Sequence, residues 1–249
     1  MNQDSGLKRV NNIDPSGIMT LSDNRMLYYL SKRILDVIFS FIALIIFSPI
    51  LLVIAILIHF DSPGPVIFTQ KRVGSKRIKK GGHYYWEKTE FPCFKFRTMV
   101  DKADPTIHQT FIKALINHDE EKLAAIQGSD SKVKKIVNDR RCTRIGHVLR
   151  KSSLDELPQF WNVLRGEMSL VGPRPAIPYE LELYKPWYFR RIEAKPGLTG
   201  LWQITARNSC DFDTMVKLDL EYIEKQSFWF DLKIVFKTPL FVLFRKGVA

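Results

Sequence analysis

Residues 37–60 read VIFSFIALIIFSPILLVIAILIHF, a run of 24 residues without a formally charged side chain. A helix of this length, at about 1.5 Å per residue, is long enough to cross the ~30 Å apolar core of a bilayer. Ser48-Pro49 stands at its centre, where proline removes a backbone donor and clashes with the preceding turn, so we expect the helix to bend or break there. The Ser48 hydroxyl can bond to a backbone group that the proline frees. The run predicts attachment to a membrane.

Lys and Arg residues flank this run on both sides: Lys8, Arg9, Arg25, Lys32 and Arg33 before it, and Lys71, Arg72, Lys76, Arg77, Lys79 and Lys80 after it. Basic residues favour the cytoplasmic side, and a helix that enters the bilayer, turns at Ser48-Pro49 and returns satisfies both flanks. A kinked transmembrane helix fits the run equally well. A buried helix of a soluble protein fits less well, because such helices are far shorter. A cleavable signal is excluded, since more than thirty mostly polar residues precede the run.

The composition points to an anionic partner. The 249 residues carry 38 Lys and Arg against 26 Asp and Glu, a net charge of +12, which suits nucleic acid, acidic lipid headgroups or a phosphorylated substrate. An apolar content of 45% excludes a disordered chain. The three cysteines are far apart and the five histidines have no ligand spacing, so neither a disulfide framework nor a zinc site is indicated. No P-loop or G-x-G-x-x-G motif is present.

The rest of the chain predicts a mainly helical α+β domain. Asp61–Pro65 is a break, followed by short strands over Val66–Gln70 and over Pro92–Met99, the latter with Lys95 and Arg97 on one face. Asp104-Pro105 is typical of a helix start, and the polar, charged residues 128–135 predict a linker or an exposed helix end. Aromatic and basic residues alternate in the tail, residues 227–247, which suits either an amphipathic helix at the headgroup boundary or an ordinary core helix.

The stretch RKSSLDELPQFWNVLRG, residues 150–166, is the most informative for chemistry. Its apolar residues Leu157, Phe160, Trp161 and Leu164 share one helix face, and Gly166 can end the helix. Asp155 and Glu156 then fall in the first turn, where the free N–H groups favour negative charge. Ser153-x-x-Glu156 also matches a capping box, a purely structural role. A first-turn acid keeps a low pKa, which suits a nucleophile or metal ligand.

Several basic residues are candidates to hold an anion. Arg174 lies between Pro173 and Pro175, so its backbone is stiff and its guanidinium can bind phosphate oxygens as a fork. The other candidates are Lys95, Arg97, Arg140, Arg141, Arg144 and Arg207. Each of these side chains could instead be a solvated charge or part of a structural ion pair.

Several long motifs occur in one order: KRILD, SPGPVIFTQKRVG, KFRTM, TRIGHVLRKSSLDELPQFWNVLRGEMSLVGPRP, KPGLTGLWQI and LDLEYI. Across residues 32–249 the chain resembles the bacterial sugar transferase family, the monotopic polyprenyl-phosphate phosphoglycosyl transferases. The resemblance implies a re-entrant membrane hairpin at Ser48-Pro49 and a compact catalytic domain, with interfacial amphipathic helices, on the cytoplasmic face of the bacterial inner membrane. It divides the chain into a polar tail (1–31), the membrane hairpin (32–62) and the catalytic domain (63–249).

The resemblance also implies the reaction and its residues. A sugar-1-phosphate passes from a nucleotide diphosphate sugar, expected to carry UDP, to polyprenyl phosphate at the start of exopolysaccharide or lipopolysaccharide synthesis. Asp155 matches the nucleophile and a ligand of Mg²⁺, the family's metal, and Glu156 matches the residue that assists proton removal. The expected substrate-binding residues are Lys95, Arg97, Arg144, Arg174, Arg207 and Asp219. Anionic lipids and a homodimer are further expected partners, and nucleic acid is not.

The sequence departs from the family pattern at four places. Gly-Glu-Met-Ser at 166–169 is longer by a methylene than the usual Gly-Asp-Met-Ser. At 139–142, Asp-Arg-Arg-Cys stands where Asp-Pro-Arg is usual, so the turn expected there loses its proline. Thr-Ala-Arg at 205–207 lacks the glycine of the usual Ser-Gly-Arg, and residues 83–90 are an insertion. The chain also lacks the extra membrane helices of larger members, so a minimal form is expected. A membrane phosphatase with an aspartyl phosphate and a non-enzymatic basic scaffold are the alternatives.

Overall fold

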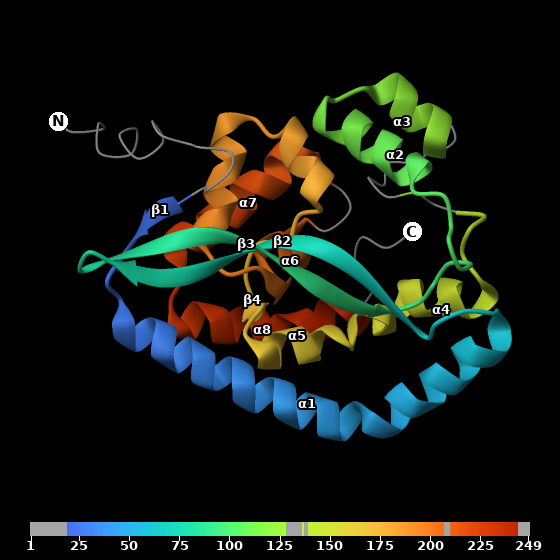
Figure 1. The fold of residues 1–249 in the computed structure, drawn as a ribbon, viewed down its shortest axis with the longest axis horizontal. Coiled ribbons are helices and arrows are strands. Elements are labelled where there is room, and N and C mark those ends of the chain that lie inside the picture. Colours follow the sequence, from blue (N-terminus) through green and yellow to red (C-terminus); the bar gives the residue numbers. More distant parts are fainter. Residues whose placement is uncertain (1–18, 128–135, 137–138, 207–209, 244–249) are drawn as a thin grey trace.

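Helix α1 (Met26–Asp61) runs along one side of the molecule and is the longest element (Figure 1). The computed structural model describes residues 19–127, 136, 139–206 and 210–243. Figure 1 shows α1 bowed, with both ends turned toward the rest of the domain. The helix begins at Met26, before the expected start at residue 32, and continues through Pro49 without a break. The Ser48 hydroxyl donates to the Ile45 carbonyl at 2.8 Å. In a regular helix this carbonyl would accept from the N–H of residue 49, which proline lacks. The predicted hydrogen bond of Ser48 to a backbone group freed by the proline is therefore confirmed.

The apolar surface of α1 is exposed rather than packed. Only Lys32, Asp36, Ser40, Ile54 and Ile58 of this helix are buried. The 18-residue stretch of α1 that is apolar enough to span a membrane is only 11% buried. By length and composition, the helix is able to cross a membrane. A core helix of a soluble domain would hide these side chains, so that alternative is wrong and a lipid environment is indicated.

A long β-hairpin packs above α1 and is larger than the sequence predicted. Strand β2 (Ile67–Lys80) pairs antiparallel with β3 (His83–Phe96), and β1 (Met19–Ser22) pairs with the other edge of β3. Gly81 and Gly82, with φ of +58° and +83°, form the two-residue turn, as tight hairpins require. The predicted strand over Val66–Gln70 is only the base of β2, and the insertion at 83–90 forms the outer half of β3.

The other elements are mostly helical, which confirms the predicted class. They comprise α2 (Thr106–Ile116), α3 (Glu120–Gln127), α4 (Arg144–Ser152), α5 (Gln159–Arg165), α6 (Leu201–Thr205), α7 (Phe212–Lys225), α8 (Phe228–Leu243), the 3₁₀ helices η2 (Leu154–Glu156), η3 (Pro178–Leu183) and η4 (Pro186–Glu193), and the parallel strands β4 (Ser169–Val171) and β5 (Gly197–Thr199). Helices α5 and α8 lie between α1 and the hairpin, whereas α2 and α3 lie on the far side of the hairpin (Figure 1). The predicted linker over 128–135 lies outside the described residues.

Two sets of contacts fasten α1 to the domain. In its first half, the buried Lys32 ammonium binds the Asp231 carboxylate of α8 at 2.8 Å and the Val171 carbonyl of β4 at 2.9 Å. One turn later, Asp36 accepts from the Leu170 N–H at 2.8 Å. The K-R-x-x-D spacing of the KRILD motif is therefore structural, since it joins the membrane helix to β4 and α8.

The second half of α1 packs against the segment that carries the acidic pair. Ile54 and Ile58 form one apolar cluster with Phe96, Leu149 and, partly buried, Leu154. Leu154 directly precedes Asp155 in the chain, so the acidic turn lies beside the half of α1 that follows Pro49.

Helix α8 has one buried face and one exposed apolar face. Ile234 and Asp231 are buried, whereas Trp229, Phe236 and Leu240 are exposed by 75%, 62% and 53%. One face of α8 belongs to the core, and the opposite face presents large apolar side chains.

Candidate functional site

Asp155 and Glu156 lie in a single 3₁₀ turn, η2, between α4 and α5. The sequence predicted the first turn of one continuous helix, but Ser153 adopts a left-handed conformation (φ 60°) and ends α4 instead. The predicted capping box is also wrong: the Ser153 N–H binds the Leu149 carbonyl, and its side chain does not cap η2. The turn holds both acids half-buried between two helices, where they are reachable from outside.

Lys95 supplies the cation that faces Glu156. Its ammonium lies 2.7 Å from the Glu156 carboxylate, with 26% and 36% of the two side chains exposed. Burial raises the pKa of Glu156, but Lys95, with further help from Arg174 and Arg72, outweighs burial and holds the pKa below its usual value. Glu156 is therefore ionised at neutral pH, as a metal ligand or a base requires and a general acid does not.

The loop that carries Arg174 is pinned on both sides. On one side, Arg72 donates to the Pro175 carbonyl at 3.0 Å, and on the other Arg191 donates to the Arg174 carbonyl at 3.1 Å. Gly172 lets this loop approach β5 closely, because a Cβ atom there would lie 2.2 Å from the Lys195 carbonyl oxygen. The stiffness expected from the two prolines is thus reinforced by tertiary contacts, and the charge of Arg174 acts on Glu156.

Arg72 belongs to the site and was not among the predicted residues. The residue is 6% exposed. Among the described residues, its guanidinium bonds to the Pro175 carbonyl and the Gln70 amide oxygen, and its Nε atom has no partner there. No carboxylate oxygen in the described part of the chain lies within 4.0 Å of it. In the sequence it is one of many basic residues between 71 and 80, and nothing distinguished it from them.

Two predicted binding residues have structural contacts instead. Arg97 is buried, and its guanidinium donates to the Pro63 carbonyl and, at 2.5 Å, to the Ser62 carbonyl, which fastens the end of α1 to β3. Asp219 is fully buried and pairs with Arg191 at 2.8 Å. Burial raises the pKa of Asp219 to about 6 against the opposing charge of Arg191. Asp219 therefore supports the Arg174 loop through Arg191 rather than facing a substrate.

Two predicted residues, Arg144 and Arg207, remain. Arg144 is exposed at the first position of α4. Arg207 lies outside the described residues. The structure thus brings Lys95, Arg174 and Glu156 together beside Asp155. Arg97 instead binds the end of α1, and the buried Asp219 pairs with Arg191 behind the Arg174 loop.

Three of the departures from the family pattern are accommodated. The longer Glu167 side chain accepts from the Asn162 amide at 2.6 Å. The Asp139 carbonyl accepts from the Cys142 N–H at 2.9 Å, so a turn forms at 139–142. Ala206 has φ −117°, which any residue adopts, so no glycine is required there.

The acidic pair offers too few ligands to hold a metal ion without further ligands from the substrate. Among the described residues no group of three or more His, Cys, Asp or Glu side chains could hold a metal ion. Magnesium is commonly bound by one or two carboxylates, with substrate phosphates completing its coordination. Asp155 and Glu156 offer two carboxylates, which matches that mode.

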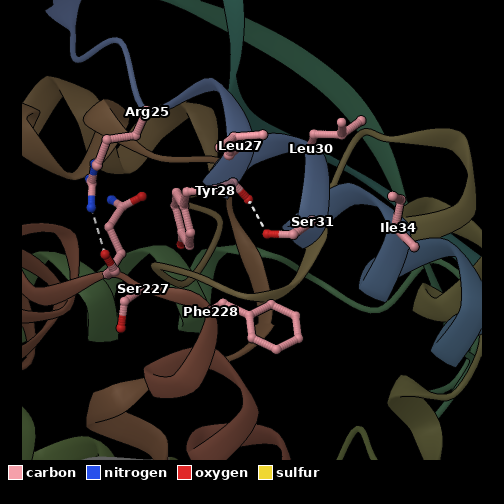
Figure 2. Close-up of a pocket in the computed structure, with 9 residues that line it drawn as sticks. Arg25, Leu27, Tyr28, Leu30, Ser31, Ile34, Ser227 and Phe228 are labelled. Carbon is pink, nitrogen blue, oxygen red and sulfur yellow. Dashed lines mark hydrogen bonds between the residues drawn. The ribbon is translucent and has the colours of Figure 1, made fainter.

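A separate groove of about 490 Å³ lies between the starts of α1 and α8. Figure 2 shows Leu27, Leu30, Ile34 and Phe228 along it, with Arg25 at one end donating to the Gln226 carbonyl at 2.6 Å. The groove holds none of the predicted site residues.

Residues 27–245 match the family model described as bacterial sugar transferase. The chain belongs to this family. It is 41% identical over 220 residues to the exopolysaccharide production protein ExoY of Rhizobium meliloti (strain 1021), covering 88% of each chain. It is 42% identical to the undecaprenyl-phosphate galactose phosphotransferase of Salmonella typhimurium (strain LT2), covering 87% of this chain and 41% of that one. It is 39% identical to the UDP-glucose:undecaprenyl-phosphate glucose-1-phosphate transferase of Escherichia coli (strain K12), covering 86% of this chain and 40% of that one.

This sugar transferase therefore spans nearly the whole of one relative and less than half of the other two. Membership makes it an enzyme of the phosphoglycosyl transferase class. The acidic turn η2 and the Arg174 loop both lie within the matched residues.

Proposed function

We propose that the enzyme transfers a sugar-1-phosphate from a UDP-sugar to undecaprenyl phosphate, as the first step of exopolysaccharide synthesis. The observation that carries the proposal is the turn η2, which holds Asp155 and Glu156 next to Lys95 and near the charge of Arg174. Undecaprenyl phosphate as the acceptor is supported by the relatives from Salmonella and Escherichia coli, which are undecaprenyl-phosphate transferases. A role in exopolysaccharide synthesis is supported by the relative ExoY, an exopolysaccharide production protein.

In the first step, a carboxylate oxygen of Asp155 attacks the phosphorus that bears the sugar. A bond forms between Asp155 and that phosphorus, the phosphoanhydride bond breaks, and its electron pair leaves with UMP. The attack brings an anion toward a diphosphate, and the cations Lys95, Arg174 and Arg72 reduce that repulsion. The reaction thus takes place as two successive displacements at phosphorus. The soluble donor and the lipid acceptor can therefore bind one after the other.

In the second step, an oxygen of undecaprenyl phosphate attacks the same phosphorus. The bond to Asp155 breaks, the carboxylate is restored, and the product is a polyprenyl-diphosphate sugar. Glu156, which stays ionised beside Lys95, accepts a proton from the lipid phosphate. A Mg²⁺ ion held by Asp155 and the donor's phosphates would neutralise phosphate charge.

The placement at the membrane is part of the proposal. We take α1 as a re-entrant helix, so that both flanks and the catalytic domain remain on the cytoplasmic face of the inner membrane. The bow of α1, the Ser48–Ile45 hydrogen bond and the basic flanks support this topology. The packing of Leu154 on Ile54 and Ile58 supports a position of the acidic turn at the lipid boundary.

The test separates the half-reaction from the whole. Membranes or purified enzyme receive a panel of UDP-sugars without lipid acceptor, and we expect one equivalent of UMP per enzyme and a phosphosugar adduct on the peptide containing Asp155. Adding undecaprenyl phosphate should discharge the adduct to lipid. Asp155→Asn should abolish the adduct, whereas Asp119→Asn, at an exposed carboxylate paired with Lys122, should not.

Product formation without any adduct at Asp155 would contradict the covalent mechanism. Release of free sugar phosphate without a need for lipid would indicate a phosphatase, and full turnover by Asp155→Asn would show that Asp155 is not the nucleophile.

A further inference from the structure

A second cavity, of about 520 Å³, lies between the first half of α1 and the β2–β3 hairpin. It is lined by more cations than anions. The charged residues around it are Lys32, Arg33, Lys76, Arg77, Arg165 and Lys195 against Asp36, Glu90 and Glu167. None of the residues assigned above to the catalytic site lines this cavity.

Part of this charge is already paired. Lys32 binds Asp231, Arg165 binds Glu167 at 3.1 Å, and Glu90 binds Lys71. Four cations remain without a carboxylate within 4.0 Å in the part of the chain that the structure describes: Arg33, Lys76, Arg77 and Lys195. The remaining anion, Asp36, is bonded to neutral donors, Ser169 and the Leu170 N–H.

Lys195 and Lys76 are the two of these cations whose side chains make no hydrogen bond with a described residue, and Lys195 is the more buried of them. Arg33 donates to the Val163 and Leu164 carbonyls, and Arg77 donates to Ser22 and the Asp23 carbonyl. Lys195 is half-buried and makes no hydrogen bond or ion pair with any described residue. Burial lowers the pKa of Lys195, and the nearby cations Arg33, Lys32 and Lys76 add to the effect against the opposing charge of Asp36. An unpaired cation in such a place is costly unless a ligand balances it.

The part of α1 that lines the cavity also carries exposed apolar side chains. Tyr29, Lys32, Arg33 and Asp36 line it from α1, whereas Leu30, Ile34 and Ile38 on other faces of the same turns are exposed by about half. These apolar side chains would face acyl chains, so the cavity would open where phospholipid headgroups lie.

We propose that this cavity binds the phosphate of an anionic phospholipid headgroup, with Lys195 and Lys76 as its cationic contacts. The site is distinct from the catalytic turn: Phe91 in the cavity and Lys95 beside Glu156 are four residues apart on β3, which is ~13 Å along a strand. The proposal does not depend on the reaction proposed above. It gives the enzyme a specific lipid contact at the N-terminal half of α1.

The experiment measures thermal stability with and without the anion. The enzyme is purified in detergent in a buffer without phosphate, and inorganic phosphate or chloride is then added to equal ionic strength. Phosphate should give the wild type a higher Tm than chloride does. Lys195→Met should lose this shift, and its Tm in chloride should equal or exceed that of the wild type, because the variant removes an unpaired charge. Lys76→Met, at an exposed position, should weaken the phosphate response several-fold. Lys217→Met, at an exposed lysine on α7 outside the cavity, is the matched control and should keep the full shift.

Nanodiscs distinguish the sources of the phosphate. Phosphatidylglycerol, compared with phosphatidylcholine alone, should stabilise the wild type but not Lys195→Met and should remove the response to added phosphate. Equal responses of the wild type and Lys195→Met, or no response of the wild type, would overturn the site. A response to phosphate without one to phosphatidylglycerol would overturn the lipid as its ligand.

Discussion

The ammonium of Lys95 lies 2.7 Å from the carboxylate of Glu156. The two residues are 61 positions apart, and their contact joins the end of strand β3 to the turn that carries both acids. The same contact keeps Glu156 ionised and leaves a partly exposed cation beside Asp155.

Removal of that cation should change both the rate and its pH dependence. Lys95→Met should lower kcat/KM roughly 10- to 100-fold, because the donor's phosphates lose a positive charge and Glu156 loses its orientation. Lys95 depresses the pKa of Glu156, so its loss raises that pKa and shifts the acidic limb of the pH–rate profile to higher pH. Lys71→Met, which removes an exposed pair with Glu90, should leave the profile in place. An unchanged profile in Lys95→Met would refute this role.

His108 should make the fold sensitive to acid. Its Nδ1 atom lies 2.6 Å from the Tyr179 hydroxyl, and burial, with Arg174, Arg72, Arg141 and Arg150, lowers its pKa to about 4. Between its usual pKa of 6.5 and this value only the unfolded chain takes the proton, so stability present above pH ~6.5 is lost as the pH falls toward 4.

The loss amounts to at most about 3 kcal/mol. His108→Gln should therefore show a smaller drop in Tm between about pH 7.5 and about pH 5 than the wild type. Equal drops in the two proteins would show that another group is responsible.

Replacing Gly172 and Gly81 by alanine should show separately how steric crowding and backbone strain affect stability. Gly172→Ala puts a Cβ atom 2.2 Å from the Lys195 carbonyl oxygen and 2.8 Å from the Gly197 nitrogen, so the pairing of β4 with β5 must open. We expect a loss of more than ~3 kcal/mol and of transferase activity with it. In Gly81→Ala the new Cβ atom has no neighbour within 4 Å, and the alanine must only adopt a positive φ. This strain should lower the free energy of unfolding by ~1–2 kcal/mol. Chemical denaturation of both variants measures the difference, and equal losses would contradict this explanation.

The Ser48-Pro49 pair should control topology. Pro49→Ala restores an N–H for the Ile45 carbonyl and straightens α1, whose 36 residues then extend over ~54 Å, enough to cross a bilayer. An N-terminal tag, which the proposed topology protects from impermeant reagents in the wild type, should become accessible from outside in this variant. Ser48→Ala keeps the proline and should keep the topology while losing roughly 1 kcal/mol. Protection of the tag in Pro49→Ala would contradict a bend set by proline.

The sequence predicted local features well because their causes are local. The apolar run from Val37 to Phe60 has its length and proline written in consecutive residues, and the bonding of Ser48 to a freed carbonyl follows from its position before Pro49. The hairpin could also have been found from Gly81-Gly82, but a charged, aromatic flank hid the alternation that strands usually show.

The roles of the basic residues were settled only by tertiary structure. Lys95 and Arg97 share one strand pattern, yet Lys95 reaches Glu156 while Arg97 binds the carbonyls at the end of α1. Arg72 joins the site and Asp219 does not, because the Arg174 loop packs between β2 and η4. A charged side chain binds a group of opposite charge or an unsatisfied hydrogen-bonding group that lies close to it in space. For Lys95 and Arg97 those partners, and for Arg72 the Pro175 carbonyl, come from residues 34 to 103 positions away. The chain alone determined which segments form helices and which acids are adjacent, and only the packing of distant segments decided which cation faces which anion.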